Sequence, residues 1–222
     1  MRAELTRLRA PLAAAGLGLG VALESEAAAR PAGPAEAAIA ARMIPSRRRE
    51  FMAGRLAARR ALRSVGLDCG DIPRAGRLPV FPPGLAASIT HSEGVAVSVA
   101  LGPGRSGAPG CDLELRELPS AASRFVLRED EEDWLHAVNP ALLPARLLTL
   151  FSAKEAAWKA LRGLPPHGAA DTGADLLPGT LRDLRAVPTR AGFRIEARGG
   201  SGTGVDVRVR KVATGVFSWV CP

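Results

Sequence analysis

The chain has 222 residues, of which 47% are hydrophobic, so it can bury a sizeable core and we expect no global disorder. Its 30 Lys and Arg residues outnumber 22 Asp and Glu residues. The resulting net charge of +8 favours polyanionic partners such as nucleic acid, a phosphate-rich cofactor or an acidic protein. No stretch approaches the ~20 apolar residues of a membrane span, so we expect no membrane partner.

The amino-terminal segment has an apolar run from Pro11 to Leu23 behind several arginines, which partly imitates a secretory signal. Glu4 stands among those arginines and three glycines interrupt the run, so we predict no cleaved signal and a strand at its end. The cysteines are odd in number and lack metal-ligand spacing, which favours a reducing compartment and a cytoplasmic protein. These cysteines are Cys69, Cys111 and Cys221.

After a short helix and loop at 30–45, the apolar spacing predicts an arginine-rich helix over 47–66, with Ser46 as its cap. Most of its arginines are expected on a solvated face. Arg47 and Arg55 lie two turns apart, and they could instead point one way and hold a phosphate.

Residues 67–87 contain many prolines and glycines and predict an extended loop, which carries Arg74 and Arg77. Alternation over 87–101 then predicts strands, with His91 between two short ones. A lone histidine is more often structural than functional. Here Thr90 and two serines are its neighbours, and small hydroxyls of this kind suit an anion site.

The sequence GPGRSGAPG at 102–110 predicts a linker, so we divide the chain into halves at 1–105 and 106–222. Asp112 and Glu114 follow it at i,i+2 on a predicted strand and therefore share one face. Two parallel carboxylates repel each other unless they share a cation or a proton, and a hard divalent metal such as Mg²⁺ is one solution. By itself this short motif is a weak signal.

Residues 120–138 predict an acidic surface helix or helix pair, and an amphipathic helix follows over 147–163. Lys154 projects from the apolar arc of the second helix and must reach water or meet a partner. Glu155 and Lys159 lie at the edge of that arc. They fit either a surface i,i+4 ion pair or the wall of a site for metal and phosphate.

A Gly-rich loop near 165–180 follows, and its His167 is regarded as incidental. Four alternating segments then predict an antiparallel sheet: 181–188, 193–198, 205–212 and 215–221. Long helices among antiparallel strands indicate an α+β protein.

Five segments occur in an order that is more specific than any one of them: REFMAGRLAARRAL, GRLPVFP, SITH, GCDLE and FSAKEAAWKAL. With this order over residues 47–162, the chain resembles the 4'-phosphopantetheinyl transferases that activate siderophore and other nonribosomal peptide synthetases. After residue 165 the resemblance is limited to the strand-like pattern.

The resemblance implies a role for each matched residue. The metal ligands would be Asp112, Glu114 and Glu155, holding Mg²⁺ with the pyrophosphate of coenzyme A. Lys154 and Lys159 would meet that pyrophosphate, and Glu155 and Lys159 would be catalytic. The 3'-phosphate of coenzyme A would meet Arg47, Arg55, Thr90 and His91, with Arg74 and Arg77 as further ligands.

The implied reaction moves 4'-phosphopantetheine from coenzyme A to a serine of an apo acyl or peptidyl carrier protein and releases 3',5'-ADP. The implied fold is α+β, with two similar halves related by a pseudo-twofold. Each half would be an antiparallel sheet with a long helix, and the active site would lie at their interface. The half 1–105 would bind the coenzyme A phosphate and the half 106–222 would hold the metal and the catalytic groups, in a monomer.

Two other functions fit parts of the sequence. A nucleic-acid-binding module fits the charge, but the chain lacks aromatics interleaved with basic residues and has two carboxylate clusters. A metal-dependent nucleotide hydrolase could use the same acidic residues without any carrier protein. The sequence does not distinguish a siderophore, polyketide, other peptide or fatty-acid pathway, or Mg²⁺ from Mn²⁺.

Overall fold

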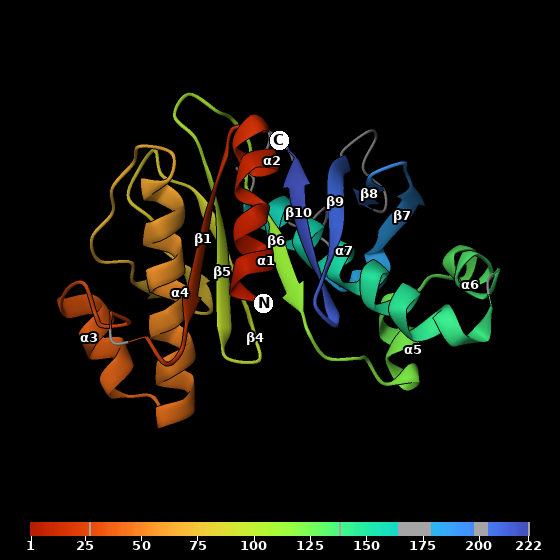
Figure 1. Cartoon of the computed structure of the whole chain (residues 1–222), viewed down its shortest axis with the longest axis horizontal. Coiled ribbons are helices and arrows are strands. Elements are labelled where there is room, and N and C mark those ends of the chain that lie inside the picture. The colour runs from red at the N-terminus through yellow and green to blue at the C-terminus, as the bar shows by residue number, and fades with distance from the viewer. Residues whose placement is uncertain (27, 138, 164–178, 198–203, 222) are drawn as a thin grey trace. The chain divides into compact units, whose positions relative to one another are not determined.

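The computed structural model describes residues 1–26, 28–137, 139–163, 179–197 and 204–221. The chain divides into two compact units, Met1–Pro109 and Gly110–Pro222. Each unit contains an antiparallel sheet and one long helix (Figure 1). The predicted α+β class is therefore confirmed. The pseudo-twofold, the active site at the interface and the roles assigned to the two halves stay predictions.

The first unit is built on a three-stranded antiparallel sheet in the order β1-β5-β4, with a separate two-stranded hairpin, β2-β3. Its elements are α1 (Arg2–Arg7), α2 (Arg9–Ala14), β1 (Leu17–Leu23), α3 (Pro34–Ala41), α4 (Pro45–Arg63), β2 (Arg74–Ala75), β3 (Leu78–Pro79), β4 (Ala87–Ser92) and β5 (Val95–Leu101). The predicted loop 67–87 thus includes a hairpin, and His91 lies within β4 instead of between two strands.

Helix α4 lies along β1 and β5 (Figure 1). It begins at Pro45, whose fixed φ suits the first helical position, after the extended residue Ile44; the predicted cap at Ser46 is therefore wrong. Its buried face includes several alanines, and Ala53, Ala57 and Ala61 are completely buried. A side chain at Gly20 of β1 would collide with the Ala57 carbonyl oxygen. Glycine in the strand and alanine in the helix therefore allow their backbones to approach closely.

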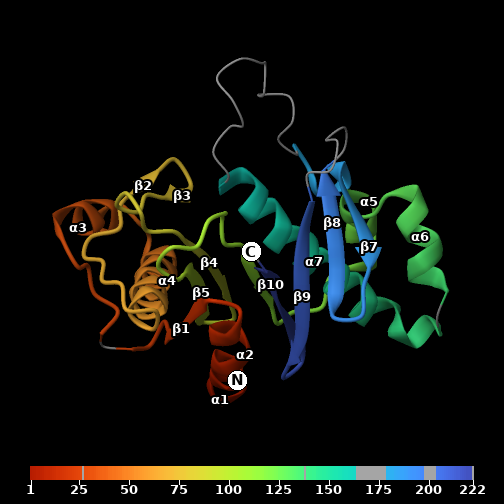
Figure 2. The same ribbon diagram turned by 90° about the horizontal axis from the view of Figure 1, so that it is seen from above.

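The second unit is built on a five-stranded antiparallel sheet in the order β6-β10-β9-β8-β7; Figure 2 shows β10 to β7 in this sequence. Its strands are β6 (Cys111–Glu114), β7 (Leu184–Pro188), β8 (Gly192–Ala197), β9 (Gly204–Val212) and β10 (Gly215–Cys221). Its helices are η1 (Ser120–Ala122), α5 (Ser123–Val126), α6 (Glu129–His136), η2 (Pro140–Leu142), α7 (Leu143–Gly163) and η4 (Leu181–Asp183). The four predicted carboxy-terminal strands and the acidic helix pair are confirmed.

Helix α7 packs on β6, β9 and β10 and supplies much of the core of this unit. It begins four residues before the predicted start at residue 147, directly after the turn of η2. Leu147, Leu150 and Leu161 of the predicted apolar arc are buried, and Phe151 and Trp158 are half-buried against the same cluster. The apolar spacing thus identified the buried face correctly.

In the described ranges, no helix is both long enough and apolar enough to cross a lipid bilayer. Most of the predicted Gly-rich loop, with His167, lies outside the described residues.

Candidate active site

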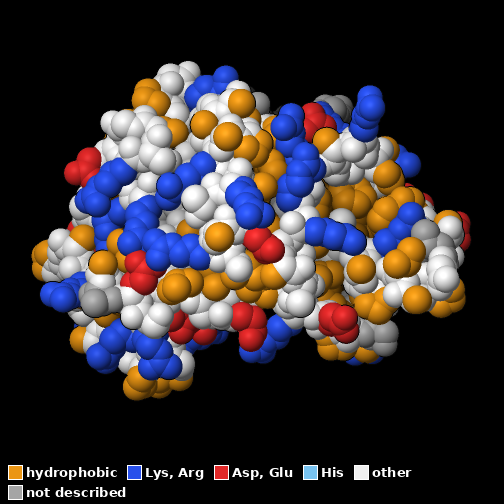
Figure 3. All heavy atoms as spheres, viewed as in Figure 1, with side chains coloured by type: hydrophobic (Ala, Val, Ile, Leu, Met, Phe, Trp, Pro, Cys, Tyr) orange, Lys and Arg blue, Asp and Glu red, His pale blue; other side chains and the backbone are white. Residues whose placement is uncertain are grey.

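Four arginines and a histidine line one cavity of the first unit, with a volume of about 590 Å³. This volume is in the range of small-molecule sites. Apart from this cavity, Lys and Arg side chains also gather on the face that Figure 3 shows, in the area where Figure 1 draws α4. The cavity is lined by Met43, Ile44, Arg47, Glu50, Phe51, Gly54, Arg55, Arg74, Arg77, Pro79, Ile89 and His91. We call it the basic cavity.

Three elements supply the basic side chains of this cavity. Arg47 and Arg55 lie two turns apart on α4, as their spacing predicted. Arg74 and Arg77 come from the β2–β3 hairpin and are exposed, and His91 comes from the end of β4. Five of the six side chains predicted to bind the 3'-phosphate are therefore brought together, although they come from distant parts of the sequence.

Thr90 is the predicted 3'-phosphate ligand that the structure places elsewhere. It is buried, with 6% of its surface exposed, and it does not line the basic cavity. Successive residues of a strand point to opposite faces, so Thr90 points away from the face that carries Ile89 and His91. The expected contact of the Thr90 hydroxyl with phosphate stays a prediction that the basic cavity does not support.

Glu50 is a carboxylate inside the basic cavity that the sequence reasoning did not single out. Its Oε2 accepts a hydrogen bond from Arg47 Nη1 at 2.6 Å and lies 4.0 Å from His91 Nε2. It is three residues after Arg47 on a helix, and that spacing is the signal that could have identified the pair. Glu50 thus pairs with Arg47 and lies beside His91, which are two of the candidate phosphate ligands.

Arg55 lies in the wall of the cavity and is only 6% exposed. Its Nε donates to the carbonyl oxygen of Ile72 at 2.7 Å and its Nη2 to that of Pro73 at 3.3 Å, while its guanidinium stacks on Phe51 at 4.4 Å. Burial lowers the pKa of Arg55 to about 10, partly offset by the charge of Glu36, so it remains charged at neutral pH. The structure thus gives Arg55 a role in holding the wall that the sequence did not predict.

A second cluster lies in the second unit, where β6 meets α7. Asp112 and Glu114 come from β6, and Glu155 and Lys159 come from α7. Lys159 Nζ donates to Asp112 Oδ1 at 2.7 Å and to the carbonyl oxygen of Cys111 at 3.1 Å. Lys159 therefore pairs with the strand, and the predicted surface ion pair with Glu155 along the helix is replaced by this contact.

Gly110 allows this approach of strand and helix. A side chain at Gly110 would collide with the carbonyl oxygen of Ala156 and would lie 2.9 Å from Ala160 Cβ. On the other side of Asp112, Ser152 Oγ donates to Ser218 Oγ of β10 at 2.9 Å. The close approach at Gly110 thus holds β6 against α7, and the buried hydrogen bond joins α7 to β10, the strand that pairs with β6.

The carboxylates of this cluster repel one another. Burial raises the pKa of Glu114 to about 7, with further increases from the charges of Asp112 and Glu155 and an opposing effect of Lys159. Burial also raises the pKa of Glu155, and Asp112 acts in the same direction while Lys159 opposes it. For Lys159, the carboxylates of Asp112 and Glu155 outweigh the effect of burial, so its pKa is raised and it stays protonated.

The donor chemistry of the cluster fits a hard divalent cation. Carboxylate oxygens are the ligands that Mg²⁺ prefers, and the raised pKa values of Glu114 and Glu155 mark a place where positive charge would stabilise them. However, within the described residues no three His, Cys, Asp or Glu side chains form a group that could hold a metal ion. The predicted ligands are brought near one another, and their assembly into a metal site stays a prediction.

Lys154 contacts a different part of the second unit. It is completely buried, and its Nζ donates to Glu131 Oε2 and to the carbonyl oxygen of Val126. Glu131 is itself 4% exposed and accepts hydrogen bonds from the backbone N–H groups of Arg128 and Ala186. The predicted contact of Lys154 with pyrophosphate is corrected to a structural ion pair, and the acidic helix predicted on the surface directs one carboxylate into the core.

Comparison with known proteins supports one family. Residues 35–101 match the family described as the 4'-phosphopantetheinyl transferase N-terminal domain. The chain is 34% identical over 194 residues to the 4'-phosphopantetheinyl transferase Svp of Streptomyces mobaraensis, a match that covers 81% of this chain and 78% of that protein.

Two further relatives match over shorter segments. The chain is 35% identical over 129 residues to the 4'-phosphopantetheinyl transferase Npt of Nocardia iowensis, covering 57% of each chain. It is 34% identical over 119 residues to the enterobactin synthase component D of Salmonella typhi, covering 51% of this chain and 48% of that protein. The chain thus spans about half the length of these two relatives. Because the match to the Streptomyces protein extends over most of both sequences, the chain belongs to the family of 4'-phosphopantetheinyl transferases.

Proposed function

We propose that the chain transfers the 4'-phosphopantetheine arm of coenzyme A to a serine of an apo acyl or peptidyl carrier protein, with Mg²⁺, and releases 3',5'-ADP. The observation that carries this proposal is the convergence of Arg47, Arg74, Arg77 and His91 on the basic cavity. Coenzyme A has a 3'-phosphate that four basic side chains can bind. Its pyrophosphate is assigned to the cluster of Asp112, Glu114, Glu155 and Lys159.

The side chains of the second cluster have complementary roles in this proposal. Asp112, Glu114 and Glu155 would hold Mg²⁺, which supplies neutralisation of the pyrophosphate charge. Glu155 accepts the proton of the carrier serine, directly or through water, and its raised pKa makes it a stronger base. Lys159 stays protonated, stabilises the charge on the leaving phosphate and can return a proton to it.

The proposed transfer is a single displacement at phosphorus. The serine oxygen forms a bond to the β-phosphorus of coenzyme A, and the bond from that phosphorus to the oxygen of 3',5'-ADP breaks. Positioning and charge neutralisation account for most of the catalysis in phosphoryl transfer of this kind. The reaction therefore requires no covalent intermediate with the protein.

The direct test is intact-mass analysis of candidate apo carrier proteins incubated with the chain, coenzyme A and Mg²⁺. We expect the carrier to gain one 4'-phosphopantetheine group. Glu155→Ala and Lys159→Ala should each reduce the rate on the order of 10²–10³-fold. Near-normal transfer by Asp112→Ala would count against the proposed metal ligands. Release of 3',5'-ADP without a carrier protein would instead identify a nucleotide hydrolase.

The basic cavity has its own test, which uses binding of 3',5'-ADP by calorimetry. Arg47 is exposed and lines the cavity, whereas Arg63 is an exposed arginine of the same helix that pairs with Asp68. We expect Arg47→Ala to weaken binding about tenfold, since one charge-assisted contact is lost, and Arg63→Ala to leave it unchanged. Equal effects of the two variants would indicate a general charge effect, and the cavity would no longer be assigned to the 3'-phosphate.

The partner and the location follow from the same proposal. The net charge of +8 suits a carrier protein with acidic residues around its serine, so the apparent affinity for the carrier should fall as salt is added. An affinity that does not change with ionic strength would contradict this part. A cytoplasmic monomer remains our expectation.

A further inference from the structure

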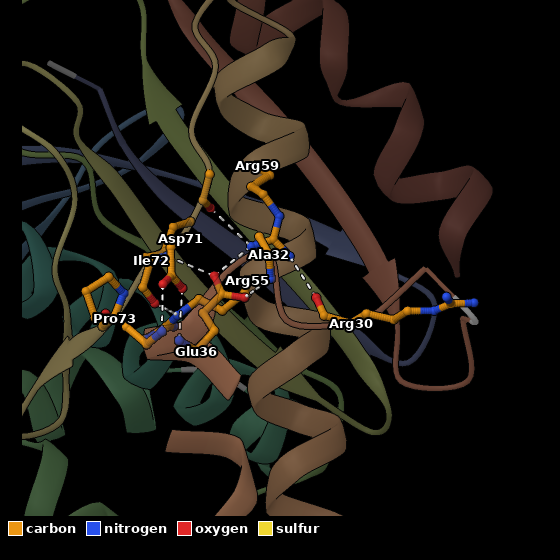
Figure 4. Close-up of polar contacts among 10 residues, drawn as sticks. Arg30, Ala32, Glu36, Arg55, Arg59, Asp71, Ile72 and Pro73 are labelled. Atoms are coloured by element: carbon orange, nitrogen blue, oxygen red, sulfur yellow. Dashed lines mark hydrogen bonds and ion pairs between the residues drawn. The ribbon is translucent and has the colours of Figure 1, made fainter. Parts of the chain in front are cut away.

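A buried polar network in the first unit connects α3, α4 and the loop that precedes β2 (Figure 4). Its centre is Glu36, which is completely buried, next to Arg59, which is 5% exposed. Glu36 Oε1 accepts from Arg59 Nη1 at 2.6 Å and from the backbone N–H of Ile72 at 2.9 Å, and Oε2 accepts from the N–H of Ala32 at 2.9 Å. One carboxylate therefore binds a helix side chain and two backbone segments.

The loop before β2 is held by side chains along its length. Arg59 Nη1 donates to the carbonyl oxygen of Gly70 at 3.4 Å, and Arg55 donates to those of Ile72 and Pro73. Both polar backbone groups of Ile72 are thus bonded by buried side chains. The polar backbone groups of this loop therefore bond to fixed protein side chains instead of to water, which limits the movement of the loop.

The same loop also fixes the start of α3. Asp71 Oδ1 accepts from the backbone N–H of Glu36 at 2.9 Å, and Oδ2 accepts from that of Ala35 at 2.8 Å. These donors belong to the first turn of α3, where N–H groups have no partner within the helix. Glu36 binds the loop and Asp71 binds the helix, so the two segments hold each other reciprocally.

The position of the β2–β3 hairpin depends on this loop. Each of its strands has two residues, and a hairpin of this size is marginal without support. The carbonyl oxygen of Pro73, which Arg55 binds, also accepts from the N–H of Val80 at 2.9 Å and so ties the far end of the hairpin to the anchored loop. Arg74 and Arg77 are carried between these two points.

We propose that Glu36 is a positioning residue for anion binding: by pairing with Arg59 and the N–H of Ile72, it fixes the hairpin that presents Arg74 and Arg77 to the basic cavity. This inference rests on the proposed function of that cavity. Charge supports it, because Glu36 is the carboxylate buried between the guanidiniums of Arg55 and Arg59. Replacing its charge leaves two buried cations close together, which is unfavourable.

The test compares Glu36→Gln with a matched variant, Glu26→Gln. Glu26 also pairs with an arginine of α4, since its carboxylate oxygens accept from Arg60 at 2.7 and 3.1 Å. It accepts from the N–H of Leu23 at the end of β1, and among the described residues its hydrogen bonds do not reach the loop before β2. We expect Glu36→Gln to raise the Kd of 3',5'-ADP and the KM of coenzyme A about tenfold with kcat within about twofold. Glu26→Gln should leave both constants unchanged.

A second readout does not depend on activity. Trypsin cleaves after exposed arginines, so cleavage after Arg74 and Arg77 reports how firmly the hairpin is held. We expect faster cleavage in Glu36→Gln than in the wild-type protein or in Glu26→Gln. If Glu36→Gln does not fold, Asp71→Asn loosens the same loop without unpairing an arginine, and it should change both readouts in the same direction.

The outcomes separate this inference from the proposed function. Unchanged 3',5'-ADP binding in Glu36→Gln, or in Asp71→Asn where Glu36→Gln does not fold, overturns the positioning role, even if cleavage is faster. Equal weakening in Glu26→Gln overturns it too, because lost stability would then explain both. A wild-type protein that binds neither 3',5'-ADP nor coenzyme A would contradict the proposed function itself.

Discussion

The buried ion pair between Lys154 and Glu131 gives the sharpest prediction about this chain, because the sequence and the structure assign Lys154 different roles. The resemblance to the family implied a contact with pyrophosphate. In the structure its ammonium is completely buried and binds Glu131 and the carbonyl oxygen of Val126. Burial lowers the pKa of Lys154, and the hydrogen bond to Glu131 opposes that change. Lys154→Met keeps most of the side-chain volume and removes the charge.

The expected loss of stability follows from the partners that remain. Without Lys154, the Glu131 carboxylate stays buried with two backbone N–H donors and has lost the ammonium group that it pairs with. Breaking a buried pair in this way costs about 3–5 kcal/mol. At about 2–4 °C of Tm per kcal/mol for a chain of this size, the Tm should fall by about 6–20 °C. Replacing both partners, Lys154→Met with Glu131→Gln, should cost less than the sum of the single changes, because neither charge is then left alone.

The assay is a double-mutant cycle measured by urea unfolding, together with 3',5'-ADP binding below the lowest Tm. We expect a favourable coupling free energy between the two residues and near-normal binding by the folded double variant. A Lys154→Met protein as stable as wild type, but unable to bind or transfer, would refute the structural role and restore the role implied by the family.

Two more predictions concern single contacts within the two units. Gly110→Ala should destabilise the chain by about 1–3 kcal/mol and reduce transfer, because the new side chain collides with Ala156 and moves β6 away from α7; Gly70→Ala, where nothing lies within 4 Å, is the control, and equal urea midpoints for the two variants would contradict the close approach. The hydrogen bond from Arg60 lowers the pKa of Glu26 below 4.5, so this pair stabilises the fold above that pH and its contribution is lost as the pH falls through the lowered pKa. The stability difference between wild type and Glu26→Gln, about 1 kcal/mol at neutral pH, should therefore shrink in acid, and a difference that grows there would reverse the sign of the argument.

Local pattern predicted the elements that carry both candidate sites. The apolar spacing of α4 and α7 and the alternation of β5 and β9 depend on neighbouring residues, so the sequence was sufficient for them. The i,i+2 spacing of Asp112 and Glu114 gave their shared face for the same reason. The hairpin of Arg74 and Arg77 was missed, because two-residue strands have too few positions to show a period.

The side chains available to the candidate sites could be listed from the sequence: the arginines of α4, the carboxylates of β6 and the lysines of α7. Their partners depend on how distant segments fold together, since Lys159 meets Asp112 across 47 residues and Lys154 meets Glu131 across 23. The physical reason is that periodicity fixes the direction of a side chain from its own element, whereas the choice of partner depends on which distant element packs there. Lys154 shows the difference, because it lies in a correctly predicted helix and pairs with a carboxylate that no local pattern reveals.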